Sequence, residues 1–398
     1  MITDRFRIEG FRAAGVRCGI KARGPDLALI ASNRPAAAAG VFTRSTVVGA
    51  PVEVSRERVR SGRARVIVAN SGCSNVAMGA RGLRDARAMA AAAATATGAD
   101  PAEVLVASTG VIGRPLPLAK LRAGIAAASR ALSPAGWPRA ARAILTTDTV
   151  PKLACTRIRI GGREVQVGGI AKGSGMIEPD MATLLSFLAT DAAVHPAYLR
   201  RVLGEAVDRS FNRVTVDGEG STSDSVLLLA NGASGAPLLR GPRSPGAARF
   251  EHAVGDLTLA LAREIARDGE GATRLITVEV RGARSDAQAE RAGRRIANSI
   301  LVKTAVFGGD PNWGRILQTL GAERLPVALS RTTVKLCGVA VFRAGSPTGP
   351  GASRRAAARL SSPEVSIQVD LGVGRGRATL LTCDLTYGYV RINAEYTT

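Results

Sequence analysis

Short runs of aliphatic and β-branched residues recur along the chain, and helical segments separate several of them. The runs are Arg65–Ala69, Val104–Ala107, Val165–Val167, Val226–Leu229, Leu275–Val280 and Val365–Val369. Two segments have helical patterns: an Ala-rich run over Asp85–Thr97, and a segment from near Glu251 whose apolar residues recur every three or four positions. Strands and helices mixed in this way predict an α/β or α+β fold.

The chain has 398 residues, enough for two domains. Gly- and Pro-rich breaks are found at Ser133–Pro138, Gly232–Pro245 and Ala344–Ala352. A further break over Gly282–Ala287 predicts a main body that ends at residue 283 and a C-terminal domain over 284–398.

The net charge of +22 raises the question of nucleic-acid binding, because Lys and Arg neutralise phosphates. The basic residues are spread along the whole chain, however, and aromatic residues, which would stack on bases, make up only 4%. Only six of the 54 basic residues are lysines, and this excess of Arg together with much Ala is typical of a GC-rich genome. We therefore expect no nucleic-acid partner.

Several other classes are disfavoured by composition. The chain contains no stretch of about 18 consecutive apolar residues, so no membrane span is predicted. Its N-terminal segment is charged and has no apolar run typical of an export signal, so we expect a cytoplasmic protein. The five cysteines are scattered singly, which favours reduced thiols over disulfides or a zinc site. His195 and His252 are far apart in sequence, so neither a metal site nor a histidine base is indicated.

The most unusual segment is Gly168–Asp191, with the sequence GGIAKGSGMIEPDMATLLSFLATD. Its glycines and proline predict an irregular loop that ends where an apolar run begins, directly after Thr183. On the local pattern alone, Thr183 would most often be a residue that caps or begins the next element.

The run KGSGMIEPDMATLL resembles the cleavage site of the ornithine acetyltransferase/glutamate N-acetyltransferase family, the ArgJ family of arginine biosynthesis. Further strings resemble this family in the same order: GFRAAGVRCGIKARG, VASTGVIGRPLP, TTDTVPK, FNRVTVDGEGSTSDSVLLLANG, RDGEGATR, VKTAVFGGDPNWGRI and GYVRINAEYTT. The resemblance covers essentially the whole chain.

The resemblance implies that the precursor cleaves itself between Ala182 and Thr183, giving an alpha chain over 1–182 and a beta chain over 183–398. A threonine hydroxyl needs a nearby base to act as a nucleophile. The new α-amino group of Thr183 supplies one, since its ordinary pKa is roughly 7.7–8.0. Thr183 would then carry an acetyl group as an ester in a two-step, ping-pong transfer.

The resemblance also assigns roles to residues elsewhere in the chain. Thr109 and Gly110 are expected to form the oxyanion hole that acyl transfer requires. The implied substrate-binding residues are Thr146, Lys172, Thr183, Glu270, Asn393 and Thr398. Lys172 suits the carboxylate of an N-acetylated amino acid, and Glu270 suits an ammonium group.

The fold implied by the family is a layered α/β/β/α body related to self-cleaving aminopeptidases, with a smaller C-terminal α/β domain. The implied assembly is a heterotetramer of two alpha and two beta chains. No metal and no tightly held cofactor are expected.

The spelling EPDMATLL and the C-terminal sequence are similar to the branch found in clavulanic acid gene clusters. That branch moves acetyl from N²-acetyl-L-ornithine to L-glutamate and makes little use of acetyl-CoA. Glu178 and Asp180, where many members have neutral residues, and NSGCSNVAMG at Asn70–Gly79 depart from the common pattern. We therefore expect the glutamate N-acetyltransferase activity, with acetyl-CoA left open as a second donor.

Two other functions remain to be distinguished. A self-processing aminopeptidase or amidase would use the same nucleophile but pass the acyl group to water. An arginine-rich nucleic-acid-binding protein would instead lose its affinity steeply as salt increases.

Overall fold

The computed structural model describes residues 6–178 and 184–395. Thr183, Ala182, Asp180 and Thr398, all named in the predictions above, lie outside the described residues. Every predicted β-type run falls within a strand, and both predicted helical segments fall within helices. The mixed α/β class is therefore confirmed.

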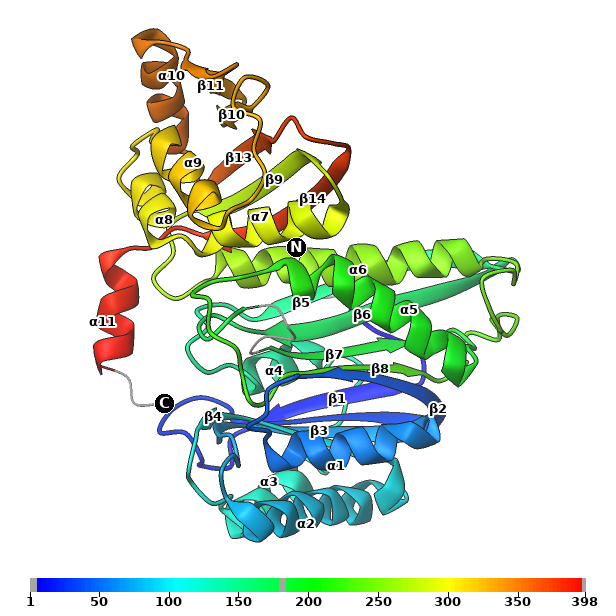
Figure 1. Ribbon diagram of the computed structural model, residues 1–398. Helices are drawn as coiled ribbons and strands as arrows, with labels where there is room; N and C mark the ends of the chain where they lie inside the picture. Colours follow the sequence, from blue (N-terminus) through cyan, green and yellow to red (C-terminus); the bar gives the residue numbers. More distant parts are fainter. Residues whose placement is uncertain (1–5, 179–183, 396–398) are drawn as a thin grey trace.

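The main body contains one eight-stranded sheet that folds over on itself (Figure 1). Its strands, in the order β4-β3-β2-β8-β7-β6-β5 with β1 beside β2, are β1 (Phe11–Val16), β2 (Leu27–Phe42), β3 (Arg63–Cys73), β4 (Val104–Val111), β5 (Lys152–Ile160), β6 (Arg163–Lys172), β7 (Leu185–Thr190) and β8 (Ser225–Ala230). The long strand β2 belongs to both halves, since its first part pairs with β3 and its last part with β8, and the register shifts between Ala31 and Ala36.

The two halves of the sheet face each other across a shared core. Ile67 and Leu105 from one half and Phe187 and Leu227 from the other belong to this core. The short helix α4 (Trp137–Ala143) also contributes to it. The remaining faces are covered by helices α1 (Ala50–Arg58), α2 (Gly79–Thr97) and α3 (Leu118–Arg130) on one side, and by α5 (Pro196–Arg209) and α6 (Ala247–Arg267) on the other.

Figure 1 shows these layers in the order helix, sheet, sheet, helix, as expected for an α/β/β/α body. The apolar residues of the strands alternate between cores, so that Val66 and Val68 face α2 while Ile67 and Ala69 face the other half-sheet. Alternation of this kind follows from the two-residue repeat of a strand.

A second sheet of six strands follows, in the order β12-β11-β10-β13-β9-β14. Its strands are β9 (Leu275–Ala283), β10 (Thr333–Leu336), β11 (Val339–Arg343), β12 (Ser346–Pro347), β13 (Glu364–Asp370) and β14 (Gly376–Cys383). Helices α7 (Asp286–Asn298), α8 (Ile300–Phe307), α9 (Trp313–Ala322) and α10 (Pro350–Leu360) share its core, and α11 (Tyr387–Glu395) follows the last strand.

The start of this sheet differs from our expectation. We placed residues 183–283 in the main body, but β9 pairs with β13 and β14 and so belongs to the second sheet. The Gly282–Ala287 break is the turn between β9 and the helix α7 that packs on it. A helix–strand turn of this kind carries the same Gly-rich signal as a domain linker.

Within the described ranges 6–178 and 184–395, no helix is long and apolar enough to cross a membrane.

Asp191, at the end of β7, provides a stability prediction. Its side chain accepts a hydrogen bond from the Gln166 amide at 2.7 Å, and burial raises the pKa of Asp191 to about 6. In the folded state the Asp191 carboxyl keeps its proton up to about pH 6, whereas in the unfolded chain it loses its proton near pH 4. The free energy of unfolding therefore falls as pH rises from about 4 to about 6.

Asp191→Asn keeps an acceptor for Gln166 and cannot ionise. We expect it to raise the free energy of unfolding at pH 8 by about 1–3 kcal/mol and to have little effect at pH 4. Thermal unfolding of the variant and the wild type at both pH values checks this. An effect of the same size at both would show that the ionisation of Asp191 is not its source.

Candidate active site

One pocket of about 100 Å³ collects the predicted site residues that the structure describes. They are Thr109, Gly110, Thr146, Lys172, Glu270 and Asn393. Ser74, Thr147, Gly175, Met176 and the Ser221–Ser223 segment also line the pocket. The six predicted residues lie in β4, β6 and α11 and in loops, although Thr109 and Asn393 are 284 positions apart in the sequence.

Thr109 and Gly110 lie at the end of β4, where this strand runs parallel to β3. Gly110 has a φ of +123°, and a Cβ there would lie only 2.5 Å from the backbone carbon of Gly72. Only glycine fits this position, because neither the backbone angle nor the space admits a side chain. The strand end thus brings a tightly held peptide to the wall of the pocket.

Lys172 is the last residue of β6 and is only 2% exposed. Its Nζ donates to Thr146 Oγ1 at 3.4 Å. Burial lowers the pKa of Lys172, although nearby carboxylates, Asp148 first among them, oppose this shift. A buried ammonium group that faces a pocket is a strong attractor for an anionic ligand.

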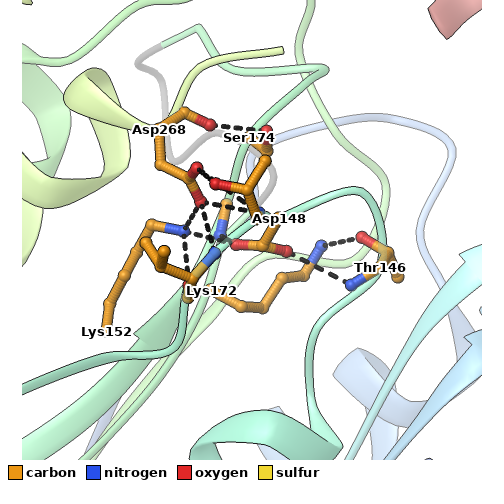
Figure 2. A network of polar contacts seen from close by, with 9 residues as sticks. Thr146, Asp148, Lys152, Lys172, Ser174 and Asp268 are labelled. Atoms are coloured by element: carbon orange, nitrogen blue, oxygen red, sulfur yellow. Dashed lines mark hydrogen bonds and ion pairs between the residues drawn. The ribbon is translucent and has the colours of Figure 1, made fainter. Parts of the chain in front are cut away.

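Three buried charges lie beside these residues in one hydrogen-bonded network (Figure 2). Lys152 Nζ donates to Asp148 Oδ1 at 2.7 Å and to Asp268 Oδ2 at 2.6 Å. Asp148 also accepts from the Gly173 amide at 2.7 Å, and the Ser174 hydroxyl donates to the Asp268 carbonyl at 2.6 Å. The network therefore ties the turn before β5, the loop after β6 and the end of α6 to one another.

Glu270 follows α6 in the sequence, lines the pocket and is 7% exposed. Its carboxylate accepts from Asn393 Nδ2 at 2.8 Å, and its amide donates to the Ser174 carbonyl at 3.0 Å. A Cβ at Gly175 would overlap the Glu270 carboxylate, so this position requires glycine. The bond to Asn393 brings helix α11 of the C-terminal part to the pocket.

Asp224 was not expected from the sequence to belong to the site. It is fully buried, and one carboxylate oxygen accepts from the Leu184 amide at 2.8 Å. Its other oxygen has no hydrogen-bond partner in the described part of the chain. Burial raises the pKa of Asp224 well above its ordinary value. Asp224 thus holds the residue that follows Thr183 in the sequence.

Asp148, Lys152 and Asp268 were likewise missed, although the strings TTDTVPK and RDGEGATR contain them. Charged residues at the start of an apolar strand were the available signal, since a buried charge requires partners. Glu178 accepts a hydrogen bond from the Asn298 amide group of α7 and does not line the pocket described above.

No group of three or more His, Cys, Asp and Glu side chains suited to a metal ion occurs among residues 6–178 and 184–395. All five cysteines lie in these ranges, and each is a free thiol.

Comparisons with known proteins identify the family of this chain. The ArgJ family matches residues 12–398. A protein of Symbiobacterium thermophilum named Arginine biosynthesis bifunctional protein ArgJ is 50% identical over 393 residues, covering 98% of this chain and 97% of its own. A Geobacter sulfurreducens protein of the same name is 47% identical over 394 residues, covering 99% and 100%.

Among solved structures, the Arginine biosynthesis bifunctional protein ArgJ of Bacillus halodurans is 40% identical with a TM-score of 0.51. That match covers 53% of this chain and 98% of the solved chain. The family match extends over nearly the whole sequence, and the relatives are matched over nearly their whole length. This chain belongs to the ArgJ family.

Proposed function

We propose that the protein is a glutamate N-acetyltransferase of arginine biosynthesis. It moves acetyl from N²-acetyl-L-ornithine to L-glutamate through an acetyl ester on Thr183 and releases L-ornithine. The observation that carries the proposal is the pocket in which a buried lysine, a buried glutamate and the Thr109–Gly110 strand end meet. These groups match a substrate that has a carboxylate, an ammonium group and an acyl carbonyl.

The chemistry follows from these groups. The Thr183 hydroxyl attacks the acetyl carbonyl while its own α-amino group takes the proton, and Thr109 and Gly110 stabilise the oxyanion. The tetrahedral intermediate expels ornithine, whose amine receives that proton. The amine of glutamate then attacks the ester, and its proton returns to the threonine oxygen as N-acetylglutamate leaves.

Cleavage between Ala182 and Thr183 is part of the proposal, since it creates the α-amino base. The length of the solved relative supports it: 53% of this chain covers 98% of that chain, and residues 183–398 make up 216 of 398 positions. The two fragments would remain together, because β6 of the first pairs with β7 of the second, and β2 of the first pairs with β8. We infer an α₂β₂ heterotetramer of such pairs, without a bound metal or cofactor.

A second candidate function is favoured by the names of the relatives, which are called bifunctional. In that case the same threonine also accepts acetyl from acetyl-CoA, and the protein makes N-acetylglutamate by two routes. The departures at Glu178 and Asp180 favour the single activity, so the donor has to be measured.

The donor prediction uses the covalent intermediate. Incubation with N-acetylornithine alone should add roughly 42 Da, one acetyl group, to the fragment that begins at Thr183, and glutamate should remove it. Acetyl-CoA is expected to load the fragment poorly. Intact-mass measurement after rapid quench follows both steps.

Equal loading rates from the two donors would establish the bifunctional enzyme. Turnover without any adduct would reject the covalent mechanism. Release of acetate at the same rate with and without glutamate would favour an amidase, and tight nucleic-acid binding that weakens steeply with salt would favour a nucleic-acid-binding protein.

A further inference from the structure

We propose that Asp148 is a positioning residue of this site, which holds Lys172 as a cation at the pocket wall, ready for the substrate carboxylate. The identity of the substrate rests on the function proposed above, whereas the link between Asp148 and Lys172 rests on their geometry.

Asp148 accepts hydrogen bonds from two segments that position the Lys172 side chain. One carboxylate oxygen accepts from the amide of Gly173, the residue that follows Lys172, at 2.7 Å. The other accepts from the Thr146 amide at 3.2 Å, and the Thr146 hydroxyl in turn accepts from Lys172 Nζ at 3.4 Å. Figure 2 shows Thr146 and Asp148 beside the end of the Lys172 side chain. Asp148 therefore fixes both the backbone of Lys172 and its hydroxyl partner.

The balance of buried charge explains why a carboxylate is needed here. Lys152 and Lys172 are 2% exposed, and two carboxylates, Asp148 and Asp268, accompany them. Two cations and two anions leave the cluster neutral, which limits the free energy that burial of charge costs. Loss of one carboxylate leaves an unbalanced cation in a place with little water.

Five charged or titratable groups from neighbouring segments interact electrostatically with the Lys172 ammonium group, some favouring and some opposing its positive charge. They are Asp148, Asp224, Lys152, Glu270 and Lys21. Burial lowers the pKa of Lys172 most, and Asp148 opposes it more strongly than any other group. Asp224 comes next, but burial raises its own pKa well above the ordinary value, which disfavours its charged form.

The Asp148 carboxylate is itself kept ionised by its neighbours. Burial would raise the pKa of Asp148, but the charges of Lys152 and Lys172 and the hydrogen bonds from Lys152 and Gly173 hold this pKa below its usual value. Asp148 is therefore ionised throughout the neutral range. Asp268, the other carboxylate of the network, is occupied by Lys152 and by the amide and hydroxyl of Thr149.

The test compares Asp148→Asn with the matched variant Asp268→Asn. Each replaces one carboxylate partner of Lys152 by an amide of the same size, so both weaken the network in the same way. Of the two carboxylates, Asp148 is the one that acts most strongly on the pKa of Lys172, ahead of every other neighbouring charge. For Asp148→Asn, we expect KM for N-acetylornithine to begin its alkaline rise about one pH unit lower than in the wild type.

At pH values on that rise, KM of Asp148→Asn should exceed that of Asp268→Asn about tenfold, while the kcat values of the two differ less. A purely structural role would lower the thermal stability of both variants and leave their pH profiles coincident. Such coincident profiles would overturn the inference.

A second readout does not depend on activity. Reductive methylation by formaldehyde and a borohydride modifies only neutral amines, and peptide mass spectrometry reports the methylated fraction of Lys172 as a function of pH. The midpoint for Asp148→Asn should lie below those of the wild type and Asp268→Asn. Equal midpoints in all three proteins would overturn the role of Asp148. A shifted midpoint in a protein that transfers no acetyl group would overturn the proposed function and leave this role standing.

Discussion

Replacing Thr183 with alanine is expected to leave the 398-residue chain uncut and to lower acetyl transfer by at least about 10⁴-fold. Both effects have one cause in the proposed mechanism, because the hydroxyl that would start cleavage at Ala182–Thr183 would also accept the acetyl group. The variant lacks this hydroxyl and, since it stays uncut, the α-amino base as well. Intact-mass measurement of the purified protein and a glutamate-dependent assay check the two effects together.

Thr183→Ser is the matched control. It keeps a hydroxyl and should cleave, though more slowly, and should retain part of the activity. The thermal unfolding temperature of Thr183→Ala shows whether the variant folds. A wild-type protein that is active only as the uncut 41.1 kDa chain would contradict the cleavage and, with it, the base that the mechanism needs.

Part of the secondary structure was accessible from the sequence, whereas the pairing of strands was not. Apolar runs such as Leu275–Val280 have a local signature that predicts a strand. The same run does not say which sheet it joins, since partners of β9 lie about 90 and 100 residues further along the chain. The main-body boundary at 283 was misplaced for this reason.

The long strand β2 was not predicted from the pattern of apolar residues either. Its sequence, LALIASNRPAAAAGVF, contains Pro35 and an Ala-rich half, both of which are unfavourable in strands. The pairing breaks around this proline, where the strand passes from one half of the sheet to the other. Tertiary packing of the small alanine side chains between the two halves therefore overrides local preference.

Recognition of the candidate site depended on the resemblance. Nothing in local sequence relates Thr109 to Asn393, and only the fold brings them to one pocket. The network of Asp148, Lys152 and Asp268 was missed because ion pairing is a tertiary property: Asp268 lies 116 positions from Lys152. Burial of these charges, which identifies them as functional candidates, is visible only in the structure.

The proposed oxyanion hole predicts the second large effect. The side chain of Thr109 is 3% exposed and lines the pocket, and its hydroxyl makes no hydrogen bond to another residue in the described ranges. Because this nearly buried hydroxyl has no other hydrogen-bond partner in the described ranges, it is available to donate to an oxyanion. Thr109→Ala is therefore expected to lower kcat by about 10²–10³-fold and to change KM little, because the donor acts mainly in the transition state.

Thr109→Ser separates the hydroxyl from the methyl group, since it keeps the donor and removes only packing. Its kcat should stay within about tenfold of the wild type, whereas Thr147→Ala, which alters another threonine of the same pocket, should not reproduce the loss. Steady-state kinetics with N-acetylornithine and glutamate give kcat and KM for each variant after its cleavage has been verified by mass. An unchanged kcat for Thr109→Ala would place the hydroxyl outside the oxyanion hole. The Gly110 amide would then be the one proposed oxyanion donor left, at a backbone position whose φ of +123° requires glycine.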